Sequence, residues 1–391
     1  MTSSETWDVV VIGAGAAGLM CAMRAGQRGR RVLVLDHADA PGKKILISGG
    51  GRCNFTNRDI RPERFVSANP HFARSALAGY TAADFTALVE RHRIPFHEKT
   101  LGQLFCDGSA REVVAMLLAE CAAVGVEIRL GHRVTGLGRA ERFGIETERG
   151  AFAAESLVLA TGGMAIPKMG ATGFALDAAR RFGLKVTATR AGLVPLTFAP
   201  DEVELMRSLA GVALPVVARS GRTAFPEAML FTHRGLSGPA ILQISSYWRD
   251  GEAITLDLLP GRDAMALLRQ GRQARGRAEA RSLLAEHLPA RLAQALGEGL
   301  GRLGDLPDRR LAELARRLQA WELRPAGTEG YAKAEVMLGG VDTAELSSRT
   351  MAARAVPGLF VVGEAVDVSG WLGGYNFQWA WSSGWAAGEA A

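Results

Sequence analysis

The sequence is poor in the residues that carry thiol and metal chemistry. Its 391 residues include only four cysteines, Cys21, Cys53, Cys106 and Cys121. None of them forms a CxxC pair or stands at zinc-ligand spacing from a histidine, which argues against a zinc site. This cysteine usage fits a reducing cytoplasm.

A basic leader and a long apolar run are also missing. The first residues carry Glu5 and Asp8, and the apolar stretch that follows is broken by Gly13, Gly15 and Gly18, unlike a signal peptide. No run of about twenty apolar residues occurs, so no membrane span is expected. We therefore expect a cytoplasmic protein that has no membrane partner.

Positive charge is concentrated in one segment of a chain whose formal net charge is +6. Residues 262–317 contain 12 arginines against seven acidic residues. Such a face can meet nucleic acid or an acidic surface. No aromatic residues are spaced there as a stacking platform, which favours a solvated helical surface over an RNA-binding one.

Glycine, by contrast, is abundant, with 47 residues that gather in short clusters. The turn Gly13-Ala-Gly15-Ala-Ala-Gly18 lies between an apolar run at 8–12 and a second one at 31–36. In a unit of strand, glycine turn, helix and strand, Gly13 permits the turn, Gly15 lets the backbone approach a pyrophosphate, and Gly18 lets the helix pack on the strand. The pattern predicts a dinucleotide-binding unit.

Asp36 ends the second run and is placed to bind a ribose, but the glycine turn and this acid do not separate NAD from FAD. Other segments favour FAD. A late strand ends at Val362-Gly363-Glu364-Ala365, and residues 371–376 open the last helix. The start of such a helix can aim N–H groups at a flavin and stabilise its reduced form. No second GxGxxG turn occurs, so NAD(P)H would have to bind transiently as an electron donor, or the electrons come from elsewhere.

The loop Lys43–Asn57, KKILISGGGRCNFTN, follows the first unit directly. Its three consecutive glycines make a poor helix and a poor strand, and we expect this glycine run to lie against a ligand. Arg52 can neutralise a phosphate or hold the loop through a carboxylate. Cys53 is either a redox thiol or a packing residue, and the absence of a nearby activating group favours packing.

These motifs carry a resemblance to a known family. The segments GKKILISGGGRCNFTN, FTHRGLSGPAIL (231–242), GGV (339–341) and VPGLFVVGEAVDVSGWLGGYNFQWAWSSGWAAG follow one another along nearly the whole chain. The order and the residues of these segments resemble those of the BaiN/YhiN-type FAD flavoproteins. The family often has Glu where Asp36 stands, which changes the geometry toward the ribose.

The resemblance implies an α/β fold with a discontinuous, glutathione-reductase-like Rossmann FAD-binding domain, interrupted by a β-rich insert and a helical subdomain. Alternating stretches and frequent prolines from Val186 to Leu259 favour the β-rich insert. The expected boundaries are 1–187 and 346–391 for the FAD domain, 188–260 and 323–345 for the insert, and 261–322 for the helices.

The same resemblance implies non-covalent FAD contacts from several separate segments. The residues concerned are Gly13, Gly15, Ala16, Ala17, Gly18, Asp36, Lys44, Ser48, Gly50, Gly51, Arg52, Cys53, Asn54, Val134, Thr161, Gly162, Gly363, Glu364, Asp367, Gly374, Tyr375, Asn376 and Phe377.

Several side chains have two interpretations. Asn376 is either an N-cap or a flavin contact, and the spacing of Phe377, Trp381 and Trp385 favours a core stripe. His233 is either a proton donor or a hydrogen-bonded structural histidine. Arg234 can bind an anionic substrate, and Lys168 and Tyr375 are further candidates.

We therefore expect an FAD-dependent oxidoreductase that exchanges a hydride with a small organic substrate. The resemblance implies NAD(P)H-linked reduction of a conjugated enone, with an amine oxidase of the aminoacetone type as one alternative. A flavin-dependent RNA-modifying or RNA-binding protein is the other, motivated by the arginine excess at 262–317. The oligomeric state is not predicted.

Overall fold

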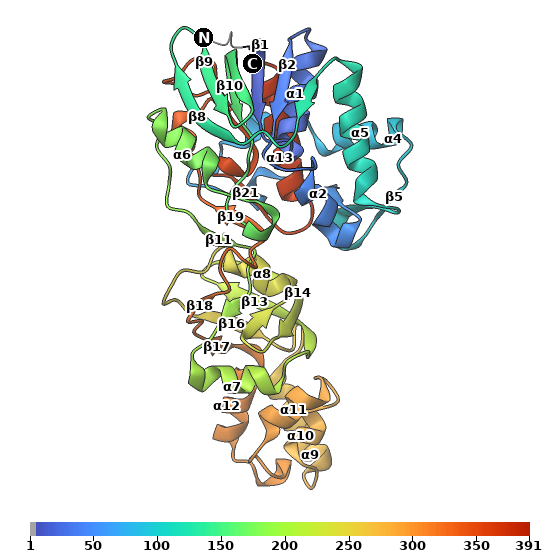
Figure 1. Cartoon of the computed structure of the whole chain (residues 1–391). Helices are drawn as coiled ribbons and strands as arrows, with labels where there is room; N and C mark the ends of the chain where they lie inside the picture. Colours follow the sequence, from blue (N-terminus) through green and yellow to red (C-terminus); the bar gives the residue numbers. More distant parts are fainter. Residues whose placement is uncertain (1–4) are drawn as a thin grey trace. The chain divides into compact units, whose positions relative to one another are not determined.

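The computed structural model describes residues 5–391, except for the side chain of Asp201. The chain forms two compact units, which we describe separately. Unit 1 comprises residues 5–190 and 336–391, and unit 2 comprises residues 191–335 (Figure 1). No helix within residues 5–391 combines the length and the apolar character that a membrane span requires.

A sheet of seven strands forms the centre of unit 1. Its order is β7-β2-β1-β10-β9-β8, and β20 also pairs with β10. β1, β2, β7, β10 and β20 pair in parallel, while β8 and β9 pair in antiparallel fashion. The parallel strands read as continuous apolar runs because both faces of such a sheet are covered. The bounds are β1 (Glu5–Ile12), β2 (Val32–Leu35), β7 (Glu127–Arg129), β8 (Val134–Arg139), β9 (Phe143–Thr147), β10 (Gly150–Leu159) and β20 (Leu359–Val361).

The helix α1 (Ala16–Gln27) packs against both α5 (Ala110–Ala123) and the last helix, α13 (Tyr375–Gly388). Glycines allow the close approach of α1 and α13, since a Cβ on Gly384 would lie 2.3 Å from the carbonyl oxygen of Ala17. The remaining helices and strands of unit 1 are α2 (Lys43–Ile47), β3 (Asn54–Asn57), β4 (Phe65–Val66), α3 (Arg74–Gly79), α4 (Ala82–Arg91), β5 (Phe96–Glu98), β6 (Gln103–Cys106), α6 (Phe174–Arg181), β19 (Val336–Leu338) and β21 (Ser369–Gly370).

Unit 2 is built on an antiparallel sheet of seven strands in the order β17-β16-β13-β14-β15-β12-β18. The strands and the linking segment are β11 (Arg190–Gly192), β12 (Leu196–Thr197), β13 (Ala213–Ser220), β14 (Thr223–Phe231), β15 (Gly235–Ser237), β16 (Ile254–Asp257), β17 (Trp321–Leu323) and β18 (Gly327–Thr328). The helices are α7 (Pro200–Ser208), α8 (Pro239–Ser245), α9 (Ala264–Arg275), α10 (Ala280–Leu284), α11 (Ala290–Gly297) and α12 (Asp308–Gln319).

Three local expectations are corrected by these bounds. The region 186–259 is less purely β than expected, because it contains α7 and α8, each of which has a proline at its start. The sequence pattern predicts a hairpin strand at 151–153 and a separate buried strand at 156–160, but residues 150–159 form one continuous strand, β10. The loop Lys43–Asn57 begins with the helix α2 and ends with the strand β3, so only its glycine-rich middle is irregular.

Candidate functional site

The glycine turn of unit 1 contains two kinds of glycine. A Cβ on Gly13 would lie 2.5 Å from the carbonyl oxygen of Ala160, and one on Gly18 would lie 1.9 Å from that of Gly13. Both positions therefore require glycine for the packing of the protein itself. A Cβ on Gly15 would meet no atom within 4 Å, so the space beside Gly15 is open to a ligand.

The N-terminus of α1 lies directly beside this open space. Its N-cap is Gly15, which provides no capping side chain, and the first turn contains no acidic residue. The first backbone N–H groups of α1 thus keep their donor capacity, and the helix dipole favours an anion there. This arrangement fits the pyrophosphate of a dinucleotide.

Asp36 fastens the turn to the end of β2. One carboxylate oxygen accepts a hydrogen bond from the backbone N–H of Ala14 at 2.7 Å, and the other accepts one from Ala38 at 2.8 Å. Each oxygen retains acceptor capacity that a ribose hydroxyl could use. The backbone N–H of His132 donates a hydrogen bond to the carbonyl of Asp36. Val134 follows His132 by two residues in the sequence.

The ends of β10 and β20 meet beside the glycine turn. Thr161 follows β10, and its buried hydroxyl has no hydrogen-bond partner within residues 5–391. A Cβ on Gly363 would lie 3.0 Å from that of Ala17, and one on Gly162 would lie 3.8 Å from Oε2 of Glu364. A ligand atom at this place would supply the hydrogen-bond partner that the Thr161 hydroxyl lacks.

Lys44 and Glu364 form an ion pair across this cluster. The other carboxylate oxygen of Glu364 accepts the N–H of Met337 at 2.8 Å. Lys44 therefore joins the loop after β2 to the end of β20, and the structure gathers these two sequence-predicted residues with Thr161 and Gly162.

The glycine run of the loop is left-handed at three successive residues, with φ of 56° at Gly49, 67° at Gly50 and 86° at Gly51. Arg52 is exposed and makes no ion pair within the described chain, so the interpretation in which a carboxylate holds it is wrong. Ser48 donates its hydroxyl to the carbonyl of Ile45 at 2.7 Å. Glycine is required at these left-handed positions because a side chain would be strained there.

Thiol chemistry has no support in this cluster. Cys53 is fully buried, and burial raises its pKa to about 12 despite an opposing hydrogen bond with Ser48. Burial likewise raises the pKa of Cys21, Cys106 and Cys121 to about 12. A buried thiol that stays protonated is inert, so the packing interpretation of Cys53 is supported.

The start of α13 faces β3 and the turn after β21. Its N-cap is Gly374, where a Cβ would lie 2.3 Å from the carbonyl oxygen of Thr56. Asn376 is not the N-cap, since its side chain bonds the backbone of Gly370 and Trp371. Asn54 on β3 hydrogen-bonds with Gln103 at 3.0 Å.

The aromatic residues of α13 pack within unit 1. Tyr375 is buried, donates its hydroxyl to the carbonyl of Asp59 at 3.1 Å, and contacts the Arg64 guanidinium. Desolvation raises the pKa of Tyr375, although Arg64 opposes the shift. Phe377 stacks on Trp381, with ring centroids 5.6 Å apart.

Asp367 is buried beyond the end of β20. Its Oδ2 accepts a hydrogen bond from the N–H of Ala68 at 3.1 Å. Desolvation raises the pKa of this carboxyl group. Lys168, in contrast, is exposed and has no ion-pair partner within residues 5–391.

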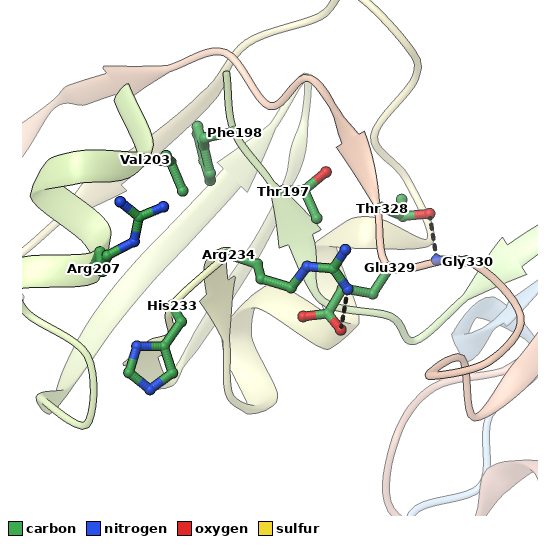
Figure 2. Close-up of a pocket in the computed structure, with 9 residues that line it drawn as sticks. All are labelled: Thr197, Phe198, Val203, Arg207, His233, Arg234, Thr328, Glu329 and Gly330. Atoms are coloured by element: carbon green, nitrogen blue, oxygen red, sulfur yellow. Dashed lines mark hydrogen bonds and ion pairs between the residues drawn. The ribbon is translucent and has the colours of Figure 1, made fainter. Parts of the chain in front are cut away.

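Unit 2 contains a separate pocket of about 470 Å³, shown in Figure 2. His233 and Arg234 line it from the turn between β14 and β15, and Arg207 lines it from the last turn of α7. The other lining residues come from α7, from β12 and β18, and from the residues directly after these strands: Val203, Thr197, Phe198, Thr328, Glu329 and Gly330.

Charge in this pocket is only loosely neutralised. Arg234 lies 3.8 Å from Glu329, and Arg207 pairs with Glu204 at 2.8 Å on the surface of α7. His233 is exposed, and its ring makes no hydrogen bond with any described residue, so the structural-histidine interpretation is wrong. Sequence reasoning missed Arg207 and Glu329, since the helix that carries Arg207 was itself unexpected.

Comparison with known proteins identifies the family. The model described as "HI0933-like protein Rossmann domain" matches residues 7–390, and the chain belongs to this family. The resemblance to BaiN/YhiN-type flavoproteins is thereby confirmed, as is the α/β class with a Rossmann-type FAD-binding domain. The protein is a flavin oxidoreductase, and the cradle of unit 1 fits FAD.

Curated relatives match over the full length. The chain is 51% identical to a protein of Escherichia coli K12 named ribosomal RNA dihydrouridine synthase, covering 98% of each chain. It is 43% identical to a Haemophilus influenzae protein of the same name, again over 98% of each. It is 30% identical to the 3-dehydro-bile acid delta(4,6)-reductase of Clostridium scindens, over 97% of this chain and 98% of the relative.

Among solved structures, a 3-ketosteroid-delta4-(5alpha)-dehydrogenase from Rhodococcus jostii RHA1 aligns with a TM-score of 0.50 at 15% identity. The alignment covers 99% of this chain and 98% of the dehydrogenase. At this identity the likeness concerns the fold alone.

Proposed function

We propose that this protein is an FAD-dependent reductase that saturates the C5–C6 bond of a uridine in ribosomal RNA, giving dihydrouridine. The observation that carries the proposal is the whole-length identity of 51% with the Escherichia coli protein of that name. The lower identity of 30% with the bile acid reductase places steroid reduction second.

The chemistry agrees with the expectation from sequence. The C5–C6 double bond of uracil is conjugated with its C4 carbonyl, so its reduction belongs to the same class as the reduction of a conjugated enone. FAD, when bound and reduced, supplies the hydride that C6 receives. C5 then takes a proton, for which the protein must provide an acid or a path from water.

The residues of unit 1 would hold and orient the cofactor. The free N–H groups at the start of α1 would bind the pyrophosphate, and Asp36 would accept from the ribose. The unpaired Thr161 hydroxyl and the Lys44–Glu364 pair would lie along the same ligand. In this proposal the FAD site of unit 1 is lined mainly by backbone, with few charged side chains.

The proton donor is proposed to be His233. The cysteines are buried with pKa values raised to about 12, which makes them unsuitable as a solvent-linked acid. His233 is exposed in the unit 2 pocket and its ring is free of hydrogen bonds with described residues. Imidazole is the side chain most often used for general acid–base transfer. NAD(P)H is proposed as the electron donor.

The test uses purified, FAD-loaded protein and ribosomal RNA transcribed in vitro, which carries no modified uridine. Anaerobic incubation with NADPH or NADH should yield dihydrouridine, detected by mass spectrometry of the digested nucleosides. Omission of the nucleotide is the control. Turnover of a steroid enone or of aminoacetone, with no dihydrouridine in the RNA, would reject the proposal and favour the corresponding small-molecule activity.

A further inference from the structure

The unit 2 pocket joins positive charge, an apolar wall and a poorly partnered carboxylate in one cavity (Figure 2). We infer that it is a subsite for one ribonucleotide of an RNA chain. In this inference, which rests on the proposed function, Arg207 and Arg234 bind the phosphate and Glu329 accepts a hydrogen bond from the nucleoside.

The two arginines are available to a phosphate. The side chain of Arg207 is 56% exposed and that of Arg234 is 73% exposed. The surface pair between Arg207 and Glu204 is worth little, and the 3.8 Å contact of Arg234 with Glu329 is too long for a hydrogen bond. Planar guanidinium groups match the oxygens of a phosphodiester in a bidentate manner.

The carboxylate of Glu329 favours a ligand that carries a hydrogen-bond donor in addition to a negative charge. Its side chain is only 11% exposed, and no described residue donates a hydrogen bond to its carboxylate. The Glu329 carboxylate can accept further hydrogen bonds, so a ligand that brings an O–H or N–H group would gain a partner there. A ribonucleotide offers both a phosphate for the arginines and ribose or base donors for Glu329.

The remaining lining suits the rest of a nucleotide. Phe198 and Val203 form an apolar wall, and Thr197 and Thr328 bring hydroxyl groups. A cavity of about 470 Å³ is larger than a lone phosphate needs and falls in the range of small-molecule sites.

The turn that carries His233 and Arg234 is held in place before any ligand binds. The Thr232 hydroxyl accepts hydrogen bonds from the N–H groups of Arg234 and Gly235 at 3.3 and 3.1 Å. Gly235 has φ of 152°, and a Cβ there would lie 2.1 Å from the carbonyl oxygen of Leu196. A fixed turn lowers the entropy cost of ordering the arginine on binding.

The experiment measures binding of a fluorescein-labelled twelve-nucleotide oligouridylate to the FAD-loaded protein by anisotropy at several salt concentrations. The double variant Arg207→Gln/Arg234→Gln should bind about tenfold more weakly, with a salt slope lower by about 1.4. The matched control is Arg219→Gln/Arg222→Gln, which removes the same charge from exposed residues of the β13–β14 hairpin. Equal losses in both variants would overturn the subsite.

The substitution Glu329→Leu gives an independent test, because two explanations predict opposite changes in RNA affinity. Removal of a negative charge alone would strengthen RNA binding, whereas loss of a hydrogen-bond acceptor would weaken it. We expect binding to weaken by about threefold. Unchanged or tighter RNA binding by Glu329→Leu would overturn the role of Glu329. A different outcome concerns the double arginine variant: a higher KM for NADPH with unchanged RNA affinity would assign the pocket to the dinucleotide instead.

Assay of the same proteins for dihydrouridine separates this inference from the proposed function. Product formation with unchanged oligouridylate binding in the double variant would reject the subsite and keep the function. Arginine-dependent binding by a wild type that forms no product would keep the subsite and reject the function.

Discussion

The two candidate sites are built from different materials. The cradle of unit 1 consists of backbone at strand ends and at a helix start. Close packing fixes it, since a Cβ on Gly18 would lie 1.9 Å from the carbonyl oxygen of Gly13. The pocket of unit 2 consists of long side chains, with Arg207 and Arg234 more than half exposed. A cofactor that stays bound can be held by rigid backbone donors, whereas a polymer that must leave is better held by solvated charges whose strength depends on salt.

The largest effect is expected at Gly18, where the comparison predicts that unit 1 tolerates no side chain. Gly18→Ala should lower the free energy of unfolding by about 3 kcal/mol and abolish FAD binding, because the carbonyl of Gly13 must move. Urea unfolding and flavin content measure both effects. A variant that is as stable as the wild type and fully yellow would contradict the close packing.

A large effect of a different kind is expected in unit 2. His233→Gln should reduce the rate of dihydrouridine formation about a hundredfold while leaving the free energy of unfolding within about 0.5 kcal/mol, since the ring has no partner to lose. Oligouridylate affinity should stay within about twofold. Loss of affinity with an unchanged rate at saturating RNA would instead show that His233 only binds.

Gly15→Ala separates the ligand-facing glycine from the packing ones. The new Cβ meets no protein atom, and φ of −88° is allowed for alanine, so the apo protein should lose less than about 1 kcal/mol. The FAD dissociation constant should rise at least about tenfold because the methyl group enters the space beside the α1 N-terminus. Titration of the apo protein with FAD decides this, and unchanged affinity would place the cofactor elsewhere.

Asp367 tests whether burial in unit 1 carries an electrostatic cost. Desolvation raises its pKa, so the carboxyl group binds its proton more tightly in the native state than in the unfolded state. The cost is absent below the unfolded pKa and grows to its full value as the pH rises through the raised native pKa. Apo Asp367→Asn should therefore melt at a higher temperature than wild type at pH 7, with the gap closing toward pH 4. A gap that is constant with pH would exclude this cause.

The smallest effect concerns a turn of unit 1 in which a leucine has a left-handed backbone conformation. Leu101 is 65% exposed and has φ of 58°, a left-handed conformation that leucine adopts at a cost. Leu101→Asn should stabilise the protein by about 1 kcal/mol, because asparagine tolerates this conformation. Differential scanning calorimetry measures the shift, and an equal or lower Tm would contradict the strain.

The first strand–turn–helix–strand unit could be predicted from sequence because its signals are local. Short apolar runs, glycine spacing and the acid Asp36 all lie within about thirty residues. The errors had local causes too. Pro200 and Pro239 look like loop punctuation but occupy the starts of α7 and α8. The predicted break between 153 and 156 lies inside the continuous β10, where Glu155 forms ion pairs with Arg30 and Arg142.

The assembly of the sites could be predicted only in part. The glycine turn and the late strand end are recognisable by motif, but the pairing of Lys44 with Glu364 joins residues 320 positions apart. In unit 2, Arg234 and Glu329 meet because β15 and β18 both pair with β12. No pattern along the chain encodes such an order of strands, so the pocket could not be drawn from sequence.

The split of unit 1 along the chain has a consequence for its biosynthesis. β10 is flanked by β1 and β20, and α1 packs against α13, so the cradle draws on residues near both ends of the chain. A ribosome releases residues 191–335, which form all of unit 2, before it releases β20 and α13. Unit 2 can therefore fold during translation, while the nascent FAD-binding half waits for the last strand and helix before it can close around its cofactor.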